Sequence, residues 1–190
     1  MSIFIGNKEV GIGVYAFAPR YGATVGCFLG SIDSNGTLQA PNATFTFTSM
    51  EMVGIAENAL NSRFKNNSGL TSVSLPNLTT VGTDGLKDAF KGCSNLTTVD
   101  FAKLSYGGLD GTFNGCSALE LVNFTSATAI PTCAEGTFAN TNATFKVMVP
   151  DALYEDWVAA SGWASIAEHI TKESDYAVVM TGYGGQDNMD

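Results

Sequence analysis

The sequence is poor in charge and in basic residues, and each shortage excludes a class of partner. Only 14% of its 190 residues are charged, and 18 carboxylates stand against nine lysines and arginines, a formal net charge of −9 at pH 7. A chain this acidic repels nucleic acid and anionic membranes, so neither is an expected partner. No apolar run reaches the roughly 20 residues of a spanning helix, so no membrane insertion is expected. The apolar start ends at Gly6, too early for the core of an export signal.

Groups that could carry catalysis or bind a metal are also few. His169 is the one histidine, and the four cysteines form no Cys-x-x-Cys pair. A cysteine–histidine nucleophile would need Cys27 or Cys133 beside His169, which the spacing gives no reason to expect. Asp84 and Asp88 are expected on a solvated helix face, and hydrolysis by paired carboxylates is the enzymatic alternative that remains. We therefore predict no enzyme, no metal site and no cofactor.

What the sequence does contain is one motif written three times between residues 70 and 144. Each copy opens with a leucine, continues with alternating apolar residues and reaches a phenylalanine, which Gly-Cys-Ser follows in two copies. The leucines stand 26 and 23 residues apart and the phenylalanines 23 and 25 apart: Leu70, Leu96 and Leu119, then Phe90, Phe113 and Phe138. Such periods mark stacked repeat units, each too small to bury its own apolar face. A leucine-rich repeat solenoid is predicted.

The repeat predicts one short strand per unit, all parallel and in one curved sheet. Apolar residues two positions apart point to the same side of a strand, and the later phenylalanine returns from the opposite wall to the same core. Residues 55–60 and 84–90 are expected to form helical turns on that wall. Cys93 and Cys116 hold the same slot of two units, which predicts buried free thiols rather than metal ligands. The expected strands lie at 45–48, 71–75, 97–101, 120–124 and 145–149.

The chain divides into three parts: an N-terminal β segment at 1–43, the repeats at 44–149, and a helical cap with a tail at 150–190. In the last part, Asp151 is expected to cap a helix that ends at Gly162, and a second short helix follows to residue 170. Trp157 and Trp163 are expected to close the open end of the solenoid. An aromatic binding patch is the alternative for these tryptophans. Residues 176–181 are a candidate strand.

The N-terminal segment carries no repeat and predicts a hairpin around Gly6-Asn7. Its apolar residues, which we predict to dock onto a partner, are Ile3, Ile5, Val10, Ile12 and Val14. A further strand is expected at 22–30 and a tight turn at 33–36. Residues 11–16 match the dinucleotide pattern G-x-G-x-x-A, but a β-prone run that ends at Pro19 follows, where that chemistry needs a helix N-terminus. No dinucleotide is expected.

Two resemblances bear on function. The units with Phe-x-Gly-Cys-Ser, and the ending from Val147 to Tyr154 with Ser161-Gly-Trp163, resemble the BspA-type leucine-rich repeats of bacterial surface proteins. The opening from Ile3 to Val10 is similar to that of short repeat proteins of bacteriophage virions. Both resemblances imply binding or assembly rather than catalysis. The third unit departs from the pattern, with Ala139-Asn-Thr in place of Gly-Cys-Ser.

We therefore predict a virion component, such as a capsid decoration, head fibre or tail-associated protein, located in the virion. A bacterial cell-surface adhesin is the alternative, although an adhesin should carry an export signal and an anchor. The expected partners are other virion proteins or sister subunits in a homo-oligomer, and a host-surface protein or glycan. The expected binding residues alternate with the core on the sheet: Thr46, Ser72, Ser74, Thr98, Asp100, Leu121, Asn123 and Lys146.

Overall fold

The structure is a computed structural model that describes residues 54–176 and the backbone of five short strands before them. Strands β1 (Ile3–Ile5) and β2 (Lys8–Val10) pair antiparallel around Gly6-Asn7, which confirms the hairpin. Strands β3 (Ser31–Ile32) and β4 (Leu38–Gln39) also pair antiparallel. Ile12, Val14, Cys27, the expected turn at 33–36, the expected strand at 22–30 and the dinucleotide-like residues 11–16 lie outside the described residues.

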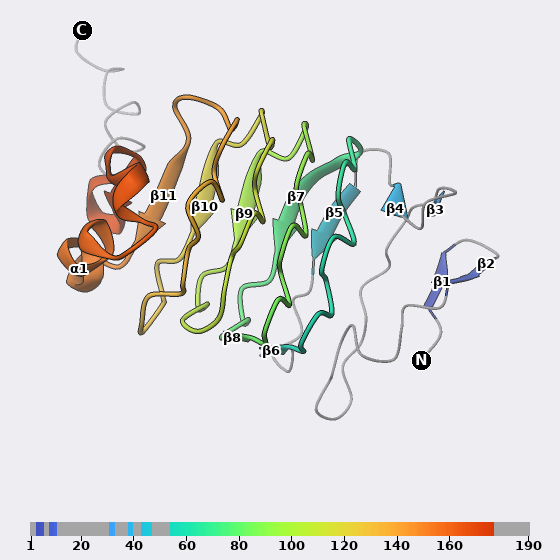
Figure 1. Cartoon of the computed structure of the whole chain (residues 1–190), viewed down its shortest axis with the longest axis horizontal. Helices are drawn as coiled ribbons and strands as arrows, with labels where there is room; N and C mark the ends of the chain where they lie inside the picture. The colour runs from blue at the N-terminus through green and yellow to red at the C-terminus, as the bar shows by residue number, and fades with distance from the viewer. Residues whose placement is uncertain are drawn as a thin grey trace, which may run out of the picture.

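Six strands form one parallel sheet along the long axis of the molecule (Figure 1). The spatial order is β12, β11, β10, β9, β7, β5, so each strand pairs with the strand one repeat earlier. The five strands predicted as parallel are confirmed, and β12 is an addition. Their bounds are β5 Ala43–Thr46, β7 Leu70–Ser74, β9 Thr98–Asp100, β10 Leu121–Asn123, β11 Lys146–Val149 and β12 Ile170–Lys172.

The register of this sheet aligns one buried β-branched residue in each of its strands from β7 to β12. From strand to strand, the register pairs Val73 with Val99, then with Val122, Val147 and Ile170 in turn. Each has 5% or less of its surface exposed. Because a one-residue slip would move this row to the solvent face, the buried row fixes the register. A second parallel ladder joins β6 (Gly54–Ile55) to β8 (Thr80–Val81), and bridges at Thr80–Tyr106 and Gly108–Thr132 continue along it.

Opposite the sheet, the chain between strands forms a wall of consecutive turns, here called the turn wall: residues 56–67, 82–92, 107–116 and 132–140. The helices expected at 55–60 and 84–90 are wrong. A residue with positive φ recurs about every four positions, and an α-helix needs φ near −63° throughout. These residues are Asn58, Ser62, Asn66, Asp84, Asp88, Gly92, Gly107, Gly111, Gly115, Gly136 and Asn140.

Hydrogen bonds join neighbouring units of the turn wall, and most of the backbone bonds run from the amides of one unit to the carbonyls of the next. The amides of Leu60 and Phe64 donate to the carbonyls of Gly85 and Ala89, both at 2.9 Å. One unit later, the amide of Phe90 donates to Thr112 at 3.1 Å. Amides at alternate positions thus donate to the following unit, while the residues between them make i to i−3 bonds within their own turn. Each unit therefore satisfies the backbone of the one before it.

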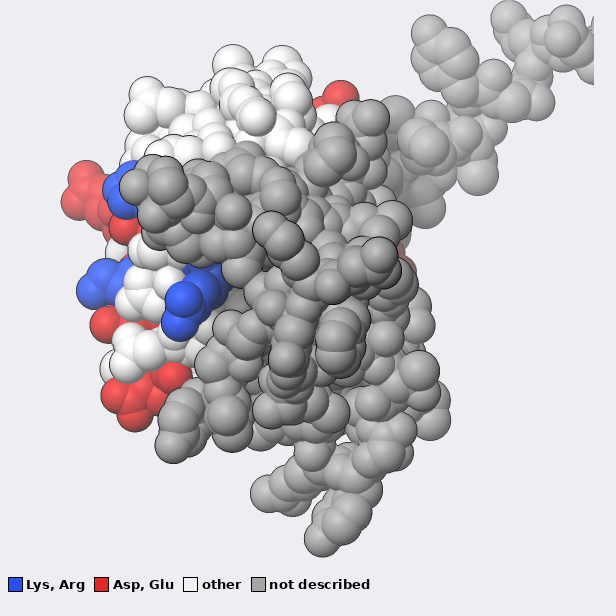
Figure 2. Space-filling view, turned by 90° about the vertical axis from the view of Figure 1, so that its right-hand side faces the viewer, with Lys and Arg blue, Asp and Glu red and all other residues white. Residues whose placement is uncertain are grey.

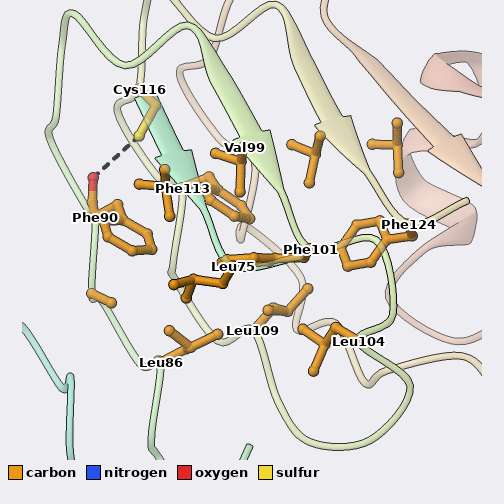
Figure 3. Close-up of a cluster of buried hydrophobic side chains, with 14 of the residues drawn as sticks. Leu75, Leu86, Phe90, Val99, Phe101, Leu104, Leu109, Phe113, Cys116 and Phe124 are labelled. Carbon is orange, nitrogen blue, oxygen red and sulfur yellow. Dashed lines mark hydrogen bonds between the residues drawn. The ribbon is translucent and has the colours of Figure 1, made fainter. Parts of the chain in front are cut away.

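The core lies between the sheet and the turn wall (Figure 3). The repeat phenylalanines form a row in which the ring centroids of Phe64, Phe90, Phe113 and Phe138 lie 5.4, 6.2 and 5.3 Å apart. Phe101 and Phe124, from the residues just after β9 and β10, lie 6.3 Å apart beside it. Because every unit contributes the same residue types at the same depth, the core is continuous along the stack.

The C-terminal cap closes the end of this core next to β11 and β12. It comprises η1 (Asp151–Leu153), α1 (Tyr154–Ala159) and η2 (Ala164–His169), with positive-φ Gly162 between the last two. Trp157 and Trp163 are fully buried, 5.4 and 5.8 Å from the ring of Phe124, and the Trp163 indole donates to the Pro131 carbonyl at 2.7 Å. The closing role is confirmed, and the aromatic-patch alternative is wrong.

Two expectations for the cap are corrected. Asp151 does not cap the helix that follows it, because Pro150 occupies the N-cap position. Its carboxylate instead accepts a hydrogen bond from the Ser174 amide at 3.2 Å, and bonds from Ser174 lower the pKa of Asp151. Tyr176 belongs to a helical turn at 173–176 rather than to a strand, and residues 177–181 lie outside the described range.

Candidate binding face of the sheet

The seven expected binding residues with described side chains do lie together on the outer side of the sheet, here called the sheet face. Each strand places a buried valine inward and its two neighbours outward, as strand geometry requires. The register aligns them in two rows, Ser72–Thr98–Leu121–Lys146 and Ser74–Asp100–Asn123. Thr46 pairs with Ser74 through its backbone, and its side chain lies outside the described atoms.

A hydrogen-bonded polar ladder crosses three adjacent strands of the sheet face. The Asn123 amide nitrogen donates to Asp100 Oδ1 at 3.0 Å, and Ser74 Oγ lies 3.5 Å from Asp100 Oδ2. Asp100 Oδ1 also accepts from the Ala102 amide at 3.1 Å, and Asn123 Oδ1 accepts from the Thr125 amide at 2.9 Å. These bonds hold Asp100 and Asn123 in defined rotamers before any partner arrives.

The second row of the sheet face is more open and of mixed character. Thr98 is exposed, while Leu121 and Lys146 are half-buried. The Lys146 ammonium donates to the Glu168 carbonyl at 3.4 Å, so this cation sits where the sheet meets the cap. The rows together offer one carboxylate, one ammonium and small polar groups. This composition suits a partner with matching polar atoms.

Met148 belongs to the sheet face, although the sequence reasoning did not include it. Its Cα partners are Asn123 on β10 and Thr171 on β12, so it extends the polar ladder toward the cap. The signal was present in the alternation of β11, where Val147 and Val149 are buried and Lys146 and Met148 are not. Met148 adds a second apolar side chain, beside Leu121, to the sheet face.

The cysteines of the described residues are buried in the core of the stack. Cys93 Sγ donates to the Phe64 carbonyl at 2.9 Å. One unit later, Cys116 Sγ donates to the Phe90 carbonyl at 3.1 Å (Figure 3). Burial raises the pKa of Cys93 to about 12 and of Cys133 to about 11, and raises that of Cys116 above its usual range. The predicted ladder of buried free thiols is confirmed.

We expect these three thiols to resist alkylation in the folded protein. In a Cys27→Ser background at pH 8, iodoacetamide should label none of them within the time that labels all three in urea, because the reactive thiolate is suppressed. The free energy of unfolding should also fall as the pH rises above roughly 8.5, because the thiols of the unfolded chain ionise there while those of the folded chain stay protonated. Mass spectrometry of labelled protein checks the first effect. Rapid labelling of the native chain would contradict it.

His169 and the paired aspartates have structural partners. The His169 ring stacks on Phe145 with centroids 4.1 Å apart, and its Nδ1 lies 3.1 Å from the Phe145 carbonyl oxygen. Only 16% of the side chain is exposed, so the ring is largely buried at the end of the cap. Asp84 pairs with Lys87, and Asp88 with Lys91, both at 3.4 Å. They lie on the turn wall, not on a helix face.

The charged groups of the turn wall are mixed in sign. Lys65 also reaches Asp88, at 4.0 Å, so this acid lies between two lysines of successive units. Figure 2, which views the molecule from the end where β5 lies, shows lysines and carboxylates interspersed on the described surface. Within residues 54–176, no three of His, Cys, Asp and Glu are grouped so that they could hold a metal ion, and no helix is long and apolar enough to cross a membrane.

Comparison with known proteins gives no relative from which a function could be transferred. No family model matches the chain, no curated protein is significantly similar to it, and no solved structure matches it. The functional assignment therefore rests on the sequence and on the geometry of the sheet face.

Proposed function

We propose that this chain is a non-enzymatic structural and binding protein, a component of a bacteriophage virion that presents the sheet face to a partner. The observation that carries the proposal is the ladder of Ser74, Asp100 and Asn123. Its side chains are fixed by hydrogen bonds on rigid, adjacent strands, and a partner that binds there need not order them.

The architecture that we propose for this role is a leucine-rich repeat solenoid of the BspA type. Its support is the recurrence of each position one unit later: the leucines Leu70, Leu96 and Leu119 are all fully buried, and the valines of the strands are register partners. The hydrogen bonds between units of the turn wall join each unit to its immediate neighbours. Stacked units of this kind present extended faces for binding.

The partner class that suits the sheet face best is a protein surface. Its eight residues with described side chains are mostly small and polar, and none is aromatic, whereas sugar rings are commonly held by aromatic side chains. Asp100 and Lys146 offer one charge of each sign, which favours a partner with both donors and acceptors. A host-surface protein therefore fits this face better than a glycan.

Bulky cations on the polar ladder should abolish binding and leave the fold intact. We expect Ser74→Arg with Asn123→Arg to weaken capture of the partner at least about tenfold, because both side chains would stand over Asp100 and cover the row. The probe is binding of the fluorescently labelled chain to intact host cells, before and after their surface proteins are removed with a protease. Asn114→Arg on the turn wall is the matched control. Equal capture by the double variant and the control would remove the sheet face from the proposal.

The N-terminal segment is proposed as the docking element, on the particle or on sister subunits in a homo-oligomer. The β1–β2 hairpin has two strands of three residues each, and an isolated two-stranded hairpin is marginal in water. Exposed strand edges invite pairing with another chain. Ile3, Ile5, Val10, Ile12 and Val14 supply the apolar side chains of this segment. The repeats and their cap would then project away from the attachment point.

Deletion of residues 1–40 should separate docking from folding. The truncated chain keeps β5 and all later strands, and it should retain the near-UV circular dichroism of buried Trp157 and Trp163. It should no longer assemble into particles or oligomers, as measured by sedimentation with purified particles and by light scattering. If the truncated chain unfolds, the segment is an N-terminal cap of the repeats and the docking proposal fails.

A further inference from the structure

Asp100 is the one carboxylate on the sheet face, and one of its two oxygens is open. Oδ1 accepts two hydrogen bonds, from the Asn123 side-chain amide at 3.0 Å and from the Ala102 backbone amide at 3.1 Å. Oδ2 has only the Ser74 hydroxyl near it, at 3.5 Å, which is longer than an ordinary hydrogen bond. One oxygen therefore holds the carboxylate in place, while the other remains able to accept.

No cation in the described part of the chain neutralises Asp100. The turn-wall acids Asp84 and Asp88 each have a lysine ammonium at 3.4 Å, whereas no described lysine, arginine or histidine lies within 4.0 Å of the Asp100 carboxylate. Lys146, the cation of the same face, stands two strands away. Because neighbouring strands are about 4.8 Å apart, roughly 10 Å or more separates the two residues. The sheet face thus keeps an uncompensated negative charge at Asp100.

The side chains on the Ser74 side of Asp100 are small and neutral. Ser74 is the register partner of Asp100 on β7, and Ser72 stands diagonally across the same pair of strands. Thr98 lies two residues before Asp100 on β9 and faces the same side of the sheet. Diagonal neighbours are about 7 to 8 Å apart, a distance that a long side chain spans. Because serine and threonine are short, a long side chain of a partner has access to Asp100 Oδ2.

Among cations, an ammonium group fits this arrangement best. A guanidinium binds a carboxylate as a fork on both oxygens, and Asp100 Oδ1 is already occupied by two donors. A calcium or magnesium ion needs about six oxygen ligands, and no three acids are grouped within the described residues. An ammonium is a compact charge with three donors. Asp100 Oδ2 and Ser74 Oγ, 3.5 Å apart, are two acceptors that it can reach together.

We infer that the sheet face binds a lysine side chain of its protein partner, with the lysine ammonium between Asp100 Oδ2 and Ser74 Oγ. This inference rests on the proposed function, because it names the group that the host-surface protein presents to the sheet face. Asp100 determines the sign of that group, and its hydrogen bond with Asn123 fixes its rotamer before binding. A partner that covers the face removes both charges from water, so loss of either charge leaves the other buried alone.

Binding of the fluorescently labelled chain to intact host cells tests the inference with two matched pairs. Asp100→Asn keeps an oxygen for the Ala102 and Asn123 donors but removes the charge, and it should weaken binding at least about tenfold. Glu135→Gln, the same change of charge at an exposed position of the turn wall, should leave binding unchanged. On the cell side, acetylation of surface lysines should weaken binding to a similar extent, whereas reductive methylation, which keeps the charge, should not.

Two results would overturn the inference: unchanged binding by Asp100→Asn, or undiminished binding to acetylated cells. The sheet face would keep its proposed role in either case if Ser74→Arg with Asn123→Arg still abolished the protease-sensitive binding. Absence of protease-sensitive binding by the unmodified chain would instead overturn the proposed function, and the inference with it. The acetylation arm uses the unmodified chain, so its result does not depend on the folding of any variant.

Discussion

Phe113→Ala should reduce the free energy of unfolding by about 3 to 5 kcal/mol. The ring is fully buried in the middle of the aromatic row, within 6.3 Å of the ring centroids of Phe90, Phe101 and Phe138 (Figure 3). Its loss leaves a cavity that stiff neighbouring units cannot fill, and it cuts the row between the N-terminal and C-terminal units. Urea unfolding followed by tryptophan fluorescence measures the effect, because both tryptophans lie in the cap.

The control for this variant is Tyr106→Ala. Tyr106 has 57% of its surface exposed, and its truncation should cost less than about 0.5 kcal/mol. A similar small loss for Phe113→Ala would mean that the phenylalanine row does not form the common core. An unchanged midpoint with a smaller denaturant slope would instead show that the units unfold separately.

Gly162→Ala should cost about 3 kcal/mol or more, well above the cost of the same change at Gly136. Both glycines have positive φ, +80° and +83°, so both variants carry the same backbone penalty of about 1 to 2 kcal/mol. Only at Gly162 does the new methyl group also meet backbone, the Cys133 carbonyl; at Gly136 nothing lies within 4 Å. The difference between the two variants, measured by urea unfolding, therefore isolates the contact between the cap and the last unit. Equal losses would contradict that contact.

The sheet could be predicted because its strands show a regular alternation of buried apolar and outward polar residues, repeated in every unit. Val73, Val99 and Val122 alternate with polar residues at a repeat spacing. The chain between them is long enough to cross back over the core, which lets successive strands pair in parallel. The same alternation placed the outward residues, so Asp100 and Asn123 were found together. Their mutual hydrogen bond could not be predicted, since it depends on which side-chain rotamers the neighbouring strands allow.

Helical turns were predicted for part of the turn wall because its positive-φ residues recur at a spacing that also fits one face of a helix. Asp84 and Asp88, four apart, match a helix face as well as they match two turns of the same kind. The distinguishing signal was the row across units: Ser62, Asp88, Gly111 and Gly136 are residues that can adopt positive φ, as are Asn66, Gly92, Gly115 and Asn140. All four residues of the second row also stand two positions after the phenylalanine of their unit.

Strand β12 escaped prediction because its apolar residue also fits a helix. Ile170 stands four residues after Ile166 and seven after Trp163, which is helical spacing, yet its backbone pairs with Val147 on β11. The edge of the parallel sheet determined its conformation, and no local pattern reveals such an edge. The cap tryptophans were placed correctly because only burial at the open end accommodates two indoles.

The measurement that bears most directly on the proposed role is the location of the chain in a lysate of the phage that we propose encodes it. Purified particles, freed of envelope fragments by density gradient, should contain the chain at a stoichiometric and constant copy number relative to the major capsid protein, as quantified by mass spectrometry. Recovery of the chain with the bacterial envelope, and its absence from particles that retain their full set of other structural proteins, would contradict the virion assignment and favour a cell-surface adhesin.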